Sequence, residues 1–353
     1  MDKIRVGIIG CGSISRCHLS AYKQLDNVEL VACADINFER AQAYARENGF
    51  QRAYPSAEAM MAQEKLDAVS VCTWNNGHAP CSVAALKAGA NVLCEKPLAM
   101  NTEEAREMAE TARKTGKLLM VGFVRRFGEN TQMLKSRIDS GDFGEIYYAK
   151  TGCIRRVGNP GGWFSNKQLS GGGPLIDLGV HMIDLTRYLM GKPKPVSVYG
   201  STFDKLGPRA NIKGIQRWTS ADWSDFNDVE DMAVGMIHYD NGATVFVENS
   251  WTQHIDTPEH LYLELYGSKC GAIMEPELKL MSEKNDYLIE EHPVVGQDQS
   301  SFDNNFAREI RHFVDCVANG TPCLNPAEDG VELMRILDAL YESARLGHEV
   351  RLQ

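Results

Sequence analysis

Short apolar runs alternate with helical segments through the first third of the chain. Buried strands are predicted at residues 4–10, 28–34, 66–72, 91–94 and 117–121. Helical segments separate them, at about 13–24, from 37 onward, and at 79–88 and 102–115. Continuous apolar strands that alternate with helices are typical of a parallel sheet with helices on both faces. We therefore predict a doubly wound α/β domain over residues 1–122.

The spacing of apolar residues changes in the second part of the chain. After a predicted helix at 130–140 and a strand at 145–154, alternation with period two predicts strands at 196–202, 229–239, 243–251 and 260–266. Asp240-Asn241-Gly242 is a hairpin turn between two of them, so these strands are expected to run antiparallel. Residues 204–227 predict a long loop, and helices at 302–317 and 327–346 close the chain. We assign residues 123–353 to a second α/β domain.

Gly10-Cys11-Gly12-Ser13-Ile14-Ser15 connects the first strand to the first helix. Gly10 permits a tight turn, and Gly12 lets the backbone approach a pyrophosphate at the helix N-terminus. Ser15 replaces the third small residue of the G-x-G-x-x-G pattern. Because a strand precedes it and a helix follows it, the motif predicts a dinucleotide site.

Asp35 ends the second strand, about twenty residues beyond the glycines. A carboxylate here accepts hydrogen bonds from the adenosine ribose and repels a 2′-phosphate, which favours NAD over NADP. The alternative is that Asp35 or Asn37 caps the helix that begins near Phe38.

Two further segments follow strands of this sheet, where ligands bind in open α/β folds. Thr73, Trp74, Asn75 and His78 lie in a polar loop before the helix at 79–88, and Glu95-Lys96-Pro97 follows the strand at 91–94. Pro97 cannot donate to a sheet, so the strand is expected to stop with Lys96 at its carboxyl end. The alternatives are a solvated loop lysine and a histidine at a helix start without chemistry.

Gly171-Gly172-Gly173-Pro174 precedes an apolar stripe that predicts a helix, with Pro174 in its first turn. Asp177 and His181 are four residues apart and share one face, and Asp184 lies on nearly the same face. A carboxylate beside an imidazole orients the ring and suits it to proton transfer near neutral pH. The alternative is an ordinary surface pair between positions i and i+4.

Composition and net charge exclude some classes of binding partner. The chain has 353 residues, 43% hydrophobic and 24% charged, with a net charge of −10 and no basic block. These values exclude nucleic acid or an anionic membrane as the main partner, and no apolar run reaches the length of a membrane span. The N-terminus enters a strand within a few residues, so no signal peptide is expected. The ten cysteines form no C-x-x-C pair, which predicts buried thiols in a cytoplasmic protein and no metal site.

Together these motifs resemble the glucose–fructose oxidoreductase / inositol dehydrogenase / rhizopine-catabolism (Gfo/Idh/MocA) family. The resemblance covers nearly the whole chain, from Gly10-x-Gly12 through Glu95-Lys96-Pro97 to the glycine-rich lead into Asp177-x-x-x-His181. It implies a Rossmann domain followed by an α/β domain with a large open, mainly antiparallel sheet. In related enzymes that sheet packs on another subunit, so a homodimer or homotetramer is expected.

The resemblance also implies roles for residues. Lys96 matches the lysine that contacts the reacting hydroxyl and the nicotinamide, His181 the general acid/base, and Asp177 the carboxylate that binds substrate. The cofactor contacts are expected from Gly10, Gly12, Ser13, Ile14, Asp35, Ile36, Arg40, Thr73, Trp74, Asn75, His78, Glu95 and Lys96. Substrate contacts are expected from Lys96, Arg126, Arg156, Trp163, Asp177 and His181. The arginines suit a carboxylate or phosphate on the substrate, or are solvated surface.

The predicted activity is an NAD-dependent dehydrogenase that oxidises a secondary hydroxyl of a sugar, sugar derivative or cyclic polyol. Leu178 stands where inositol dehydrogenases are expected to have a hydroxyl residue, which favours a sugar over inositol. Two alternatives stay open. One is a redox-neutral enzyme that oxidises a sugar, eliminates an aglycone and reduces the sugar again, and the other is a non-catalytic NAD-binding regulator.

Overall fold

The computed structural model describes residues 3–214, 217–275, 277–294 and 302–352. The chain forms two compact units, Met1–Phe127 with Ser301–Met334, and Gly128–Ser300 with Arg335–Gln353.

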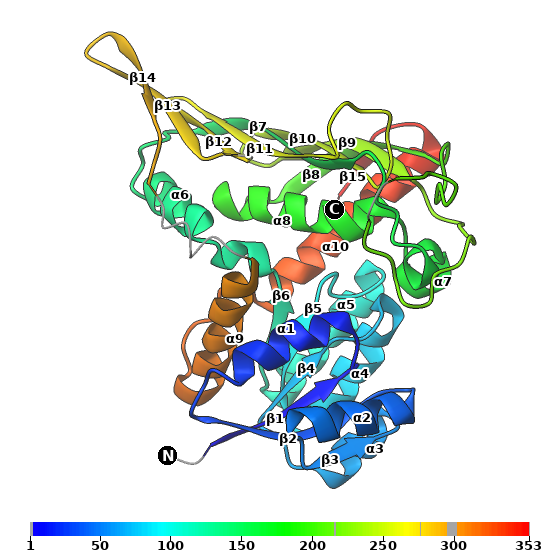
Figure 1. Ribbon diagram of the computed structural model, residues 1–353. Coiled ribbons are helices and arrows are strands. Elements are labelled where there is room, and N and C mark those ends of the chain that lie inside the picture. Colours follow the sequence, from blue (N-terminus) through cyan, green and yellow to red (C-terminus); the bar gives the residue numbers. More distant parts are fainter. Residues whose placement is uncertain (1–2, 215–216, 276, 295–301, 353) are drawn as a thin grey trace. The chain divides into compact units, whose positions relative to one another are not determined.

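A six-stranded sheet forms the centre of the first unit (Figure 1). Its strands are β1 (Ile4–Ile9), β2 (Val28–Ala34), β3 (Arg52–Tyr54), β4 (Ala68–Val71), β5 (Asn91–Glu95) and β6 (Leu119–Gly122), in the order β3-β2-β1-β4-β5-β6. Every pairing is parallel. The prediction of a doubly wound sheet is confirmed. The strand order reverses between β1 and β4, which is where such folds bind nucleotides.

Helices connect these strands. They are α1 (Ser13–Tyr22), α2 (Phe38–Asn48), α3 (Ala57–Gln63), α4 (Asn75–Lys87), α5 (Thr102–Thr115), the short η1 (Val124–Phe127) and α9 (Phe302–Asn319), while α10 (Ala327–Leu346) spans the boundary between the units. Asn37 caps α2 by accepting the N–H of Arg40, and Gly49 ends it in a left-handed conformation. The expectation of a loop at 73–78 was wrong, because α4 already begins at Asn75. Gly77 and Pro80 are poor helix formers and concealed this start from sequence reasoning.

Helix α9 belongs to the first unit, although it follows the second unit in sequence. It packs beside α1 (Figure 1), and its Ile310 and Phe313 join the buried cluster that contains Val6 and Ile8 of β1. The sequence-based division at residue 122 placed this helix in the second domain. An amphipathic helix shows that it has a partner but not which core covers its apolar face.

A nine-stranded sheet dominates the second unit, in the order β14-β13-β12-β11-β7-β10-β9-β8-β15. The strands are β7 (Ile146–Arg155), β8 (Pro195–Phe203), β9 (Met232–Tyr239), β10 (Thr244–Ser250), β11 (Glu259–Gly267), β12 (Cys270–Glu275), β13 (Lys279–Lys284), β14 (Tyr287–Glu291) and β15 (Val350–Arg351). Only the β7–β10 pairing is parallel, so the prediction of a mainly antiparallel sheet is confirmed. Strands β12 to β14 were not predicted, because β13 and β14 are short and largely polar.

One face of this sheet is covered by helices of the same unit. These are α6 (Glu129–Asp139), η2 (Gly162–Ser165), α7 (Lys167–Ser170), the π-helical turn η3 (Leu175–Gly179) and α8 (Val180–Leu189), which lies along the sheet in Figure 1. Gly200 and Gly235 leave room for Leu340 of α10 on this face. The opposite face presents Tyr199 and Met236, each 47% exposed, from paired positions of β8 and β9.

Within the described residues, none of the helices combines the length and the apolar character needed to cross a lipid bilayer.

Candidate active site

The Gly10–Gly12 turn has the geometry of an anion cradle. Gly10 has φ +91°, and a Cβ atom there would lie 2.6 Å from the carbonyl oxygen of Cys72, so only glycine fits. A Cβ atom on Gly12 would have nothing within 4 Å, and Gly12 caps α1 without any side-chain hydrogen bond. The first N–H groups of α1, at Ser13 and Ile14, are therefore left for a ligand. A pyrophosphate fits this arrangement.

Asp35 lies next to this turn and is nearly buried. Its Oδ2 accepts the N–H of Cys11 at 2.8 Å and Nε–H of Arg40 at 3.0 Å, while Oδ1 accepts from Asn37 N–H at 2.8 Å and Arg40 Nη2 at 2.7 Å. Asn37, not Asp35, caps α2. Because four donors already surround the carboxylate, ribose hydroxyls can reach it only if the half-exposed Arg40 side chain moves aside.

A cavity of about 370 Å³ brings seven of the thirteen predicted cofactor residues together. Its lining includes Gly10, Gly12, Asp35, Ile36, Arg40, Thr73 and Trp74. Ile36 is 82% exposed, which suits an apolar contact with a base. A glycine cradle, an apolar wall and a carboxylate are the parts that a dinucleotide site needs, so these residues fit NAD.

His78 lies away from that cavity wall and serves the backbone instead. It is 1% exposed, with Nδ1 2.7 Å from the carbonyl oxygen of Pro97 and Nε2 3.2 Å from that of Thr73. Burial lowers the pKa of His78, although the hydrogen bond to Pro97 opposes this. The predicted direct cofactor contact of His78 is therefore replaced by support of the Lys96–Pro97 segment.

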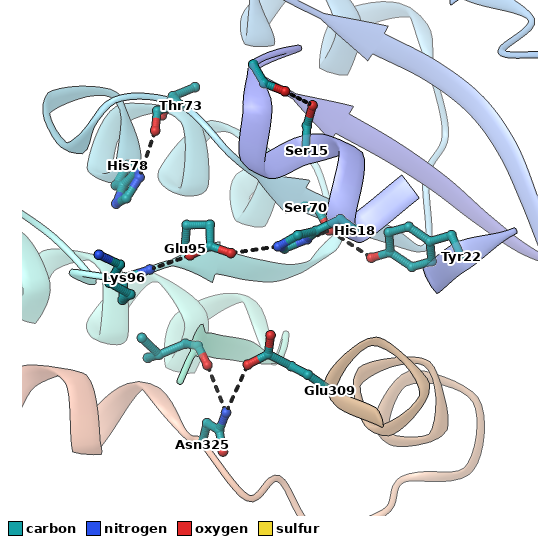
Figure 2. A network of polar contacts seen from close by, with 12 residues as sticks. Ser15, His18, Tyr22, Ser70, Thr73, His78, Glu95, Lys96, Glu309 and Asn325 are labelled. Carbon is teal, nitrogen blue, oxygen red and sulfur yellow. Dashed lines mark hydrogen bonds and ion pairs between the residues drawn. The ribbon is translucent and has the colours of Figure 1, made fainter. Parts of the chain in front are cut away.

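Two other predicted cofactor residues, Asn75 and Glu95, are also buried. Figure 2 shows Glu95 between His18 and the backbone N–H of Lys96, inside the first unit. Glu95 contacts protein groups, whereas the side chain of Lys96 is half-buried at the carboxyl end of β5.

Asp177 and His181 come from a helix that is not regular. Asp177 belongs to the π-helical turn η3, and His181 to the first turn of α8. The expected uninterrupted α-helix from Pro174 was thus wrong, and π-helical turns are frequent at functional sites. Both side chains are half-buried, while Asp184 is buried at 4% exposure and does not share their environment. The pairing of Asp177 with His181 stays a prediction, and Asp184 is more deeply buried than either of them.

One residue that the sequence did not single out holds Asp177. Trp251, fully buried after β10, donates its indole Nε1–H to Oδ2 of Asp177 at 3.0 Å. Arg155 donates from Nε to Oε1 of Glu259 at 2.6 Å; burial lowers the pKa of its guanidinium, but nearby Cys153, Glu259 and Asp177 raise it overall. Trp251 stood at the end of a predicted strand, and no pattern indicated which side chain its indole meets.

Glu230 anchors the start of the same segment. Its carboxylate accepts the N–H groups of Gly173 at 2.9 Å and Leu175 at 3.1 Å, and the hydroxyl of Tyr341 at 2.8 Å. Burial raises the pKa of Glu230, although these hydrogen bonds oppose the shift. A Cβ atom on Gly173 would lie 2.2 Å from the carbonyl oxygen of Glu230, so the predicted glycine run is required by this contact.

The three remaining predicted substrate residues differ in burial and in what they contact. Arg126 is 0% exposed and donates from Nη1 to Leu324 O and Asp329 Oδ2, both at 2.8 Å, so its assignment to substrate is corrected to a buried support of the first unit. Arg156 is exposed on the loop after β7. Trp163 lies against Phe164 with ring centroids 3.8 Å apart, and Phe164 meets the exposed Trp218 edge-on at 5.6 Å. The loops at 158–166 and 217–223 thus present an aromatic surface.

His312, Cys316 and Cys323 gather in the first unit, with donor atoms within 4.8 Å of one another. The sequence did not predict such a cluster. However, Nε2 of His312 already accepts the N–H of Leu324 at 2.9 Å and lies 3.5 Å from Cys316 Sγ. A metal at this nitrogen would leave a backbone donor unsatisfied, so we assign the cluster no ligand. All ten cysteines are free thiols.

Family models match both parts of the chain. One, described as an oxidoreductase family with an NAD-binding Rossmann fold, matches residues 4–123, and its C-terminal alpha/beta domain model matches residues 135–352. The D-glucoside 3-dehydrogenase of Escherichia coli (strain K12) is 37% identical over 351 residues, covering 99% of this chain and 97% of that protein.

More distant proteins agree in fold. The scyllo-inositol 2-dehydrogenase (NAD(+)) of Bacillus subtilis (strain 168) is 28% identical over 356 residues, covering 99% of this chain and 96% of that protein. Levoglucosan dehydrogenase, solved in complex with NADH and L-sorbose, has a TM-score of 0.87 at 24% identity, with 100% of both chains covered. The structural likeness supports the fold alone.

Proposed function

Because this chain belongs to the Gfo/Idh/MocA family of oxidoreductases, we propose that it is an NAD-dependent dehydrogenase acting on a secondary hydroxyl of a sugar or sugar derivative. The observation that carries the proposal is the 37% identity, over almost the whole length, to a D-glucoside 3-dehydrogenase. The 3-hydroxyl of a D-glucoside is accordingly the first substrate group to test.

We assign the chemical roles to three side chains. His181 takes the proton of the substrate hydroxyl as general base. Lys96, positively charged, stabilises the negative charge that develops on that oxygen. Asp177, held by Trp251, accepts hydrogen bonds from the sugar and keeps His181 oriented. When bound, NAD⁺ supplies the hydride acceptor, and the protein supplies orientation and charge.

Cofactor choice rests on Asp35 and Arg40. Asp35 at the end of β2 favours a free ribose hydroxyl, and therefore NAD. Arg40 pairs with this carboxylate and offsets part of its repulsion of a 2′-phosphate. We propose NAD as the working cofactor, with NADP accepted more weakly.

The aromatic surface supports a sugar substrate. Trp163, Phe164 and Trp218 offer flat apolar rings, with Trp218 57% exposed. The apolar face of a pyranose, made of C–H groups, packs on such rings while its hydroxyls meet polar side chains.

We also propose that the outer face of the nine-stranded sheet joins copies of the chain. Tyr199, Met236 and Phe246 occupy neighbouring positions of β8, β9 and β10 on that face. Stacked Tyr148 and Tyr266 extend it over β7 and β11. Lys150 and Glu264 pair beside these tyrosines on the same face. Exposed apolar residues gathered on one sheet face are a liability in a monomer, so a homodimer or homotetramer is expected.

The test is reduction of NAD⁺, followed by absorbance, with a panel of D-glucosides, free sugars and inositols, and NADP⁺ in parallel. A glucoside signal that His181→Ala reduces by about 100-fold or more supports the proposal, in line with the usual contribution of a general base. His348→Ala, which changes an exposed histidine near the end of the chain, is the matched control.

Two outcomes would contradict the proposed dehydrogenase activity. Release of the aglycone without accumulation of NADH indicates the redox-neutral cleavage cycle instead. Unchanged turnover of His181→Ala across neutral pH removes His181 as the acid/base.

A further inference from the structure

We propose that His18 is a positioning residue for Lys96 and acts through the carboxylate of Glu95. The inference rests on the proposed function, because it presupposes that Lys96 meets the cofactor and the reacting hydroxyl.

Geometry links the three residues directly (Figure 2). His18 of α1 is 0% exposed, and its Nε2 lies 2.7 Å from Oε1 of Glu95. The other oxygen of the same carboxylate, Oε2, accepts the backbone N–H of Lys96 at 3.2 Å. One carboxylate therefore connects a buried imidazole of α1 to the residue at the carboxyl end of β5.

The direction of each hydrogen bond follows from the network around His18. Tyr22 Oη lies 2.8 Å from Ser70 Oγ, and Ser70 Oγ lies 3.1 Å from Nδ1 of His18. Because a carboxylate oxygen can only accept, Nε2 of His18 carries a proton and donates it to Glu95, while Nδ1 meets the hydroxyl of Ser70. Every donor and acceptor in this series of hydrogen bonds is then satisfied. The last acceptor is a charged carboxylate, which makes the bond from His18 to Glu95 the strongest of the series.

The charge state of Glu95 agrees with this direction. Burial raises the pKa of Glu95, but the hydrogen bond from His18 and the charges nearby lower it below its usual value. The titratable groups around it are His18, Lys96 and His78, with the thiols of Cys17, Cys72 and Cys94. Burial raises the pKa of these thiols, so they stay neutral and Glu95 carries the negative charge.

The surroundings leave Glu95 and Lys96 little freedom. A Cβ atom on Gly122 of β6 would lie 3.2 Å from Oε2 of Glu95, so the carboxylate fills the space of a missing side chain. On the other side of Lys96, the carbonyl oxygen of Pro97 is bonded to the buried His78. The backbone of Lys96 is thus tied before and after the residue, which fixes where its long side chain starts.

The experiment compares His18→Leu, which removes both ring nitrogens, with His18→Gln, whose amide N–H can still reach Glu95. We expect His18→Leu to lower kcat by about tenfold or more, as small misplacements of a reacting group do. A buried carboxylate that loses its donor takes up a proton at higher pH, so the acidic limb of the kcat profile should move to higher pH. His18→Gln should restore most of both effects.

Tyr54→Phe is the matched control. It removes the hydroxyl that lies 2.6 Å from another buried carboxylate, Glu64, in the same unit. A general loss of buried hydrogen bonding would affect Tyr54→Phe and His18→Leu alike. If His18→Leu does not fold, Ser70→Ala, which removes the hydroxyl that meets Nδ1, takes its place.

A second measurement separates this inference from the proposed function. NADH affinity is measured for His18→Leu, Lys96→Ala and the double variant. Coupling between the two positions supports the positioning role even if no sugar is turned over, an outcome that would overturn the dehydrogenase alone. Additive effects on NADH affinity, or an unchanged kcat and pH profile in His18→Leu, would overturn the inference.

Discussion

Trp251 and Asp177 are 74 residues apart in sequence, and the indole Nε1–H of the first donates to Oδ2 of the second across 3.0 Å. The contact joins the end of β10 to the π-helical turn η3 within the second unit. It holds the carboxylate proposed to bind substrate in one orientation.

Trp251→Phe should reduce kcat/KM for the sugar by roughly 10- to 100-fold. The reason is that hydrogen bonds to charged groups contribute about 1.5–3 kcal/mol, and phenylalanine retains the ring but not the donor. Steady-state kinetics measure the loss. Trp223→Phe, which shortens an indole that packs on Gly161, should have a smaller effect, and equal losses in both variants would argue against a specific Asp177 contact.

Gly173→Ala should destabilise the protein by about 1–3 kcal/mol, as is usual when atoms are added to a filled space. The added methyl group would meet the carbonyl oxygen of Glu230 at 2.2 Å and its carboxyl carbon at 3.0 Å. Denaturant unfolding measures the change. Gly271→Ala, whose Cβ would approach Leu265 O only to 3.2 Å, is the milder comparison, and a Gly173→Ala protein of wild-type stability would contradict the contact.

His78 should make stability depend on pH in a known direction. Burial holds its pKa below the usual 6.5, so between the two values the unfolded chain binds a proton that the folded chain does not. The free energy of unfolding therefore rises with pH across this window and falls as pH drops below 6.5. His78→Asn removes the titrating group and keeps a donor for Pro97, so its stability should depend less on pH.

Denaturant unfolding from about pH 5 to pH 8 tests this difference. The exposed His348 provides the control through His348→Asn, which should keep the wild-type pH dependence. Identical pH dependence in the wild type and His78→Asn would show that His78 takes up a proton equally in both states.

Asp35→Ala and Arg40→Ala should move cofactor preference in opposite directions. In Asp35→Ala, loss of the carboxylate removes both the ribose acceptor and the repulsion of a 2′-phosphate. The ratio of kcat/KM with NAD to kcat/KM with NADP should therefore fall by roughly tenfold or more, equivalent to about 1.4 kcal/mol. Loss of the guanidinium frees the carboxylate and should raise the ratio. Parallel kcat/KM values for both cofactors give the answer, and an unchanged ratio in Asp35→Ala would remove Asp35 from ribose recognition.

Met236→Lys should weaken self-association. A charge in the middle of an apolar interface carries a desolvation cost that the partner cannot offset. Light scattering after size exclusion should show a lower mass than for the wild type. Phe38→Lys changes an exposed apolar residue of the first unit and should leave the mass unchanged. A monomeric wild type would contradict the proposed interface.

Much of the first unit was predictable because its signals are local. The strand at 28–34 and the helix at 102–115 were predicted with the bounds that the structure has. Asn101 caps that helix, and Gly116 ends it in a left-handed conformation. The residues that start and stop the helix are therefore its direct neighbours in sequence. The same holds for Gly10 and Gly12, whose roles depend on the strand before and the helix after.

Other features were not predictable, because they depend on residues far away in the chain. The sequence presented Arg126 as an arginine available to substrate, yet Asp329 neutralises it inside the fold. His18 lies on an ordinary helix, and its partners Ser70 and Glu95 follow 52 and 77 residues later in the chain.

The chain's own pattern was thus sufficient for the alternation of strands and helices and for the dinucleotide turn, while the pairing of Asp177 with His181 stays a prediction. These follow from period, turn chemistry and short spacings, which act between neighbours. Tertiary structure decided that α9 joins the first core, that Trp251 meets Asp177, and that Glu95 faces His18. Such contacts depend on how separate elements pack, and burial then determines which charges are paired and which remain for chemistry.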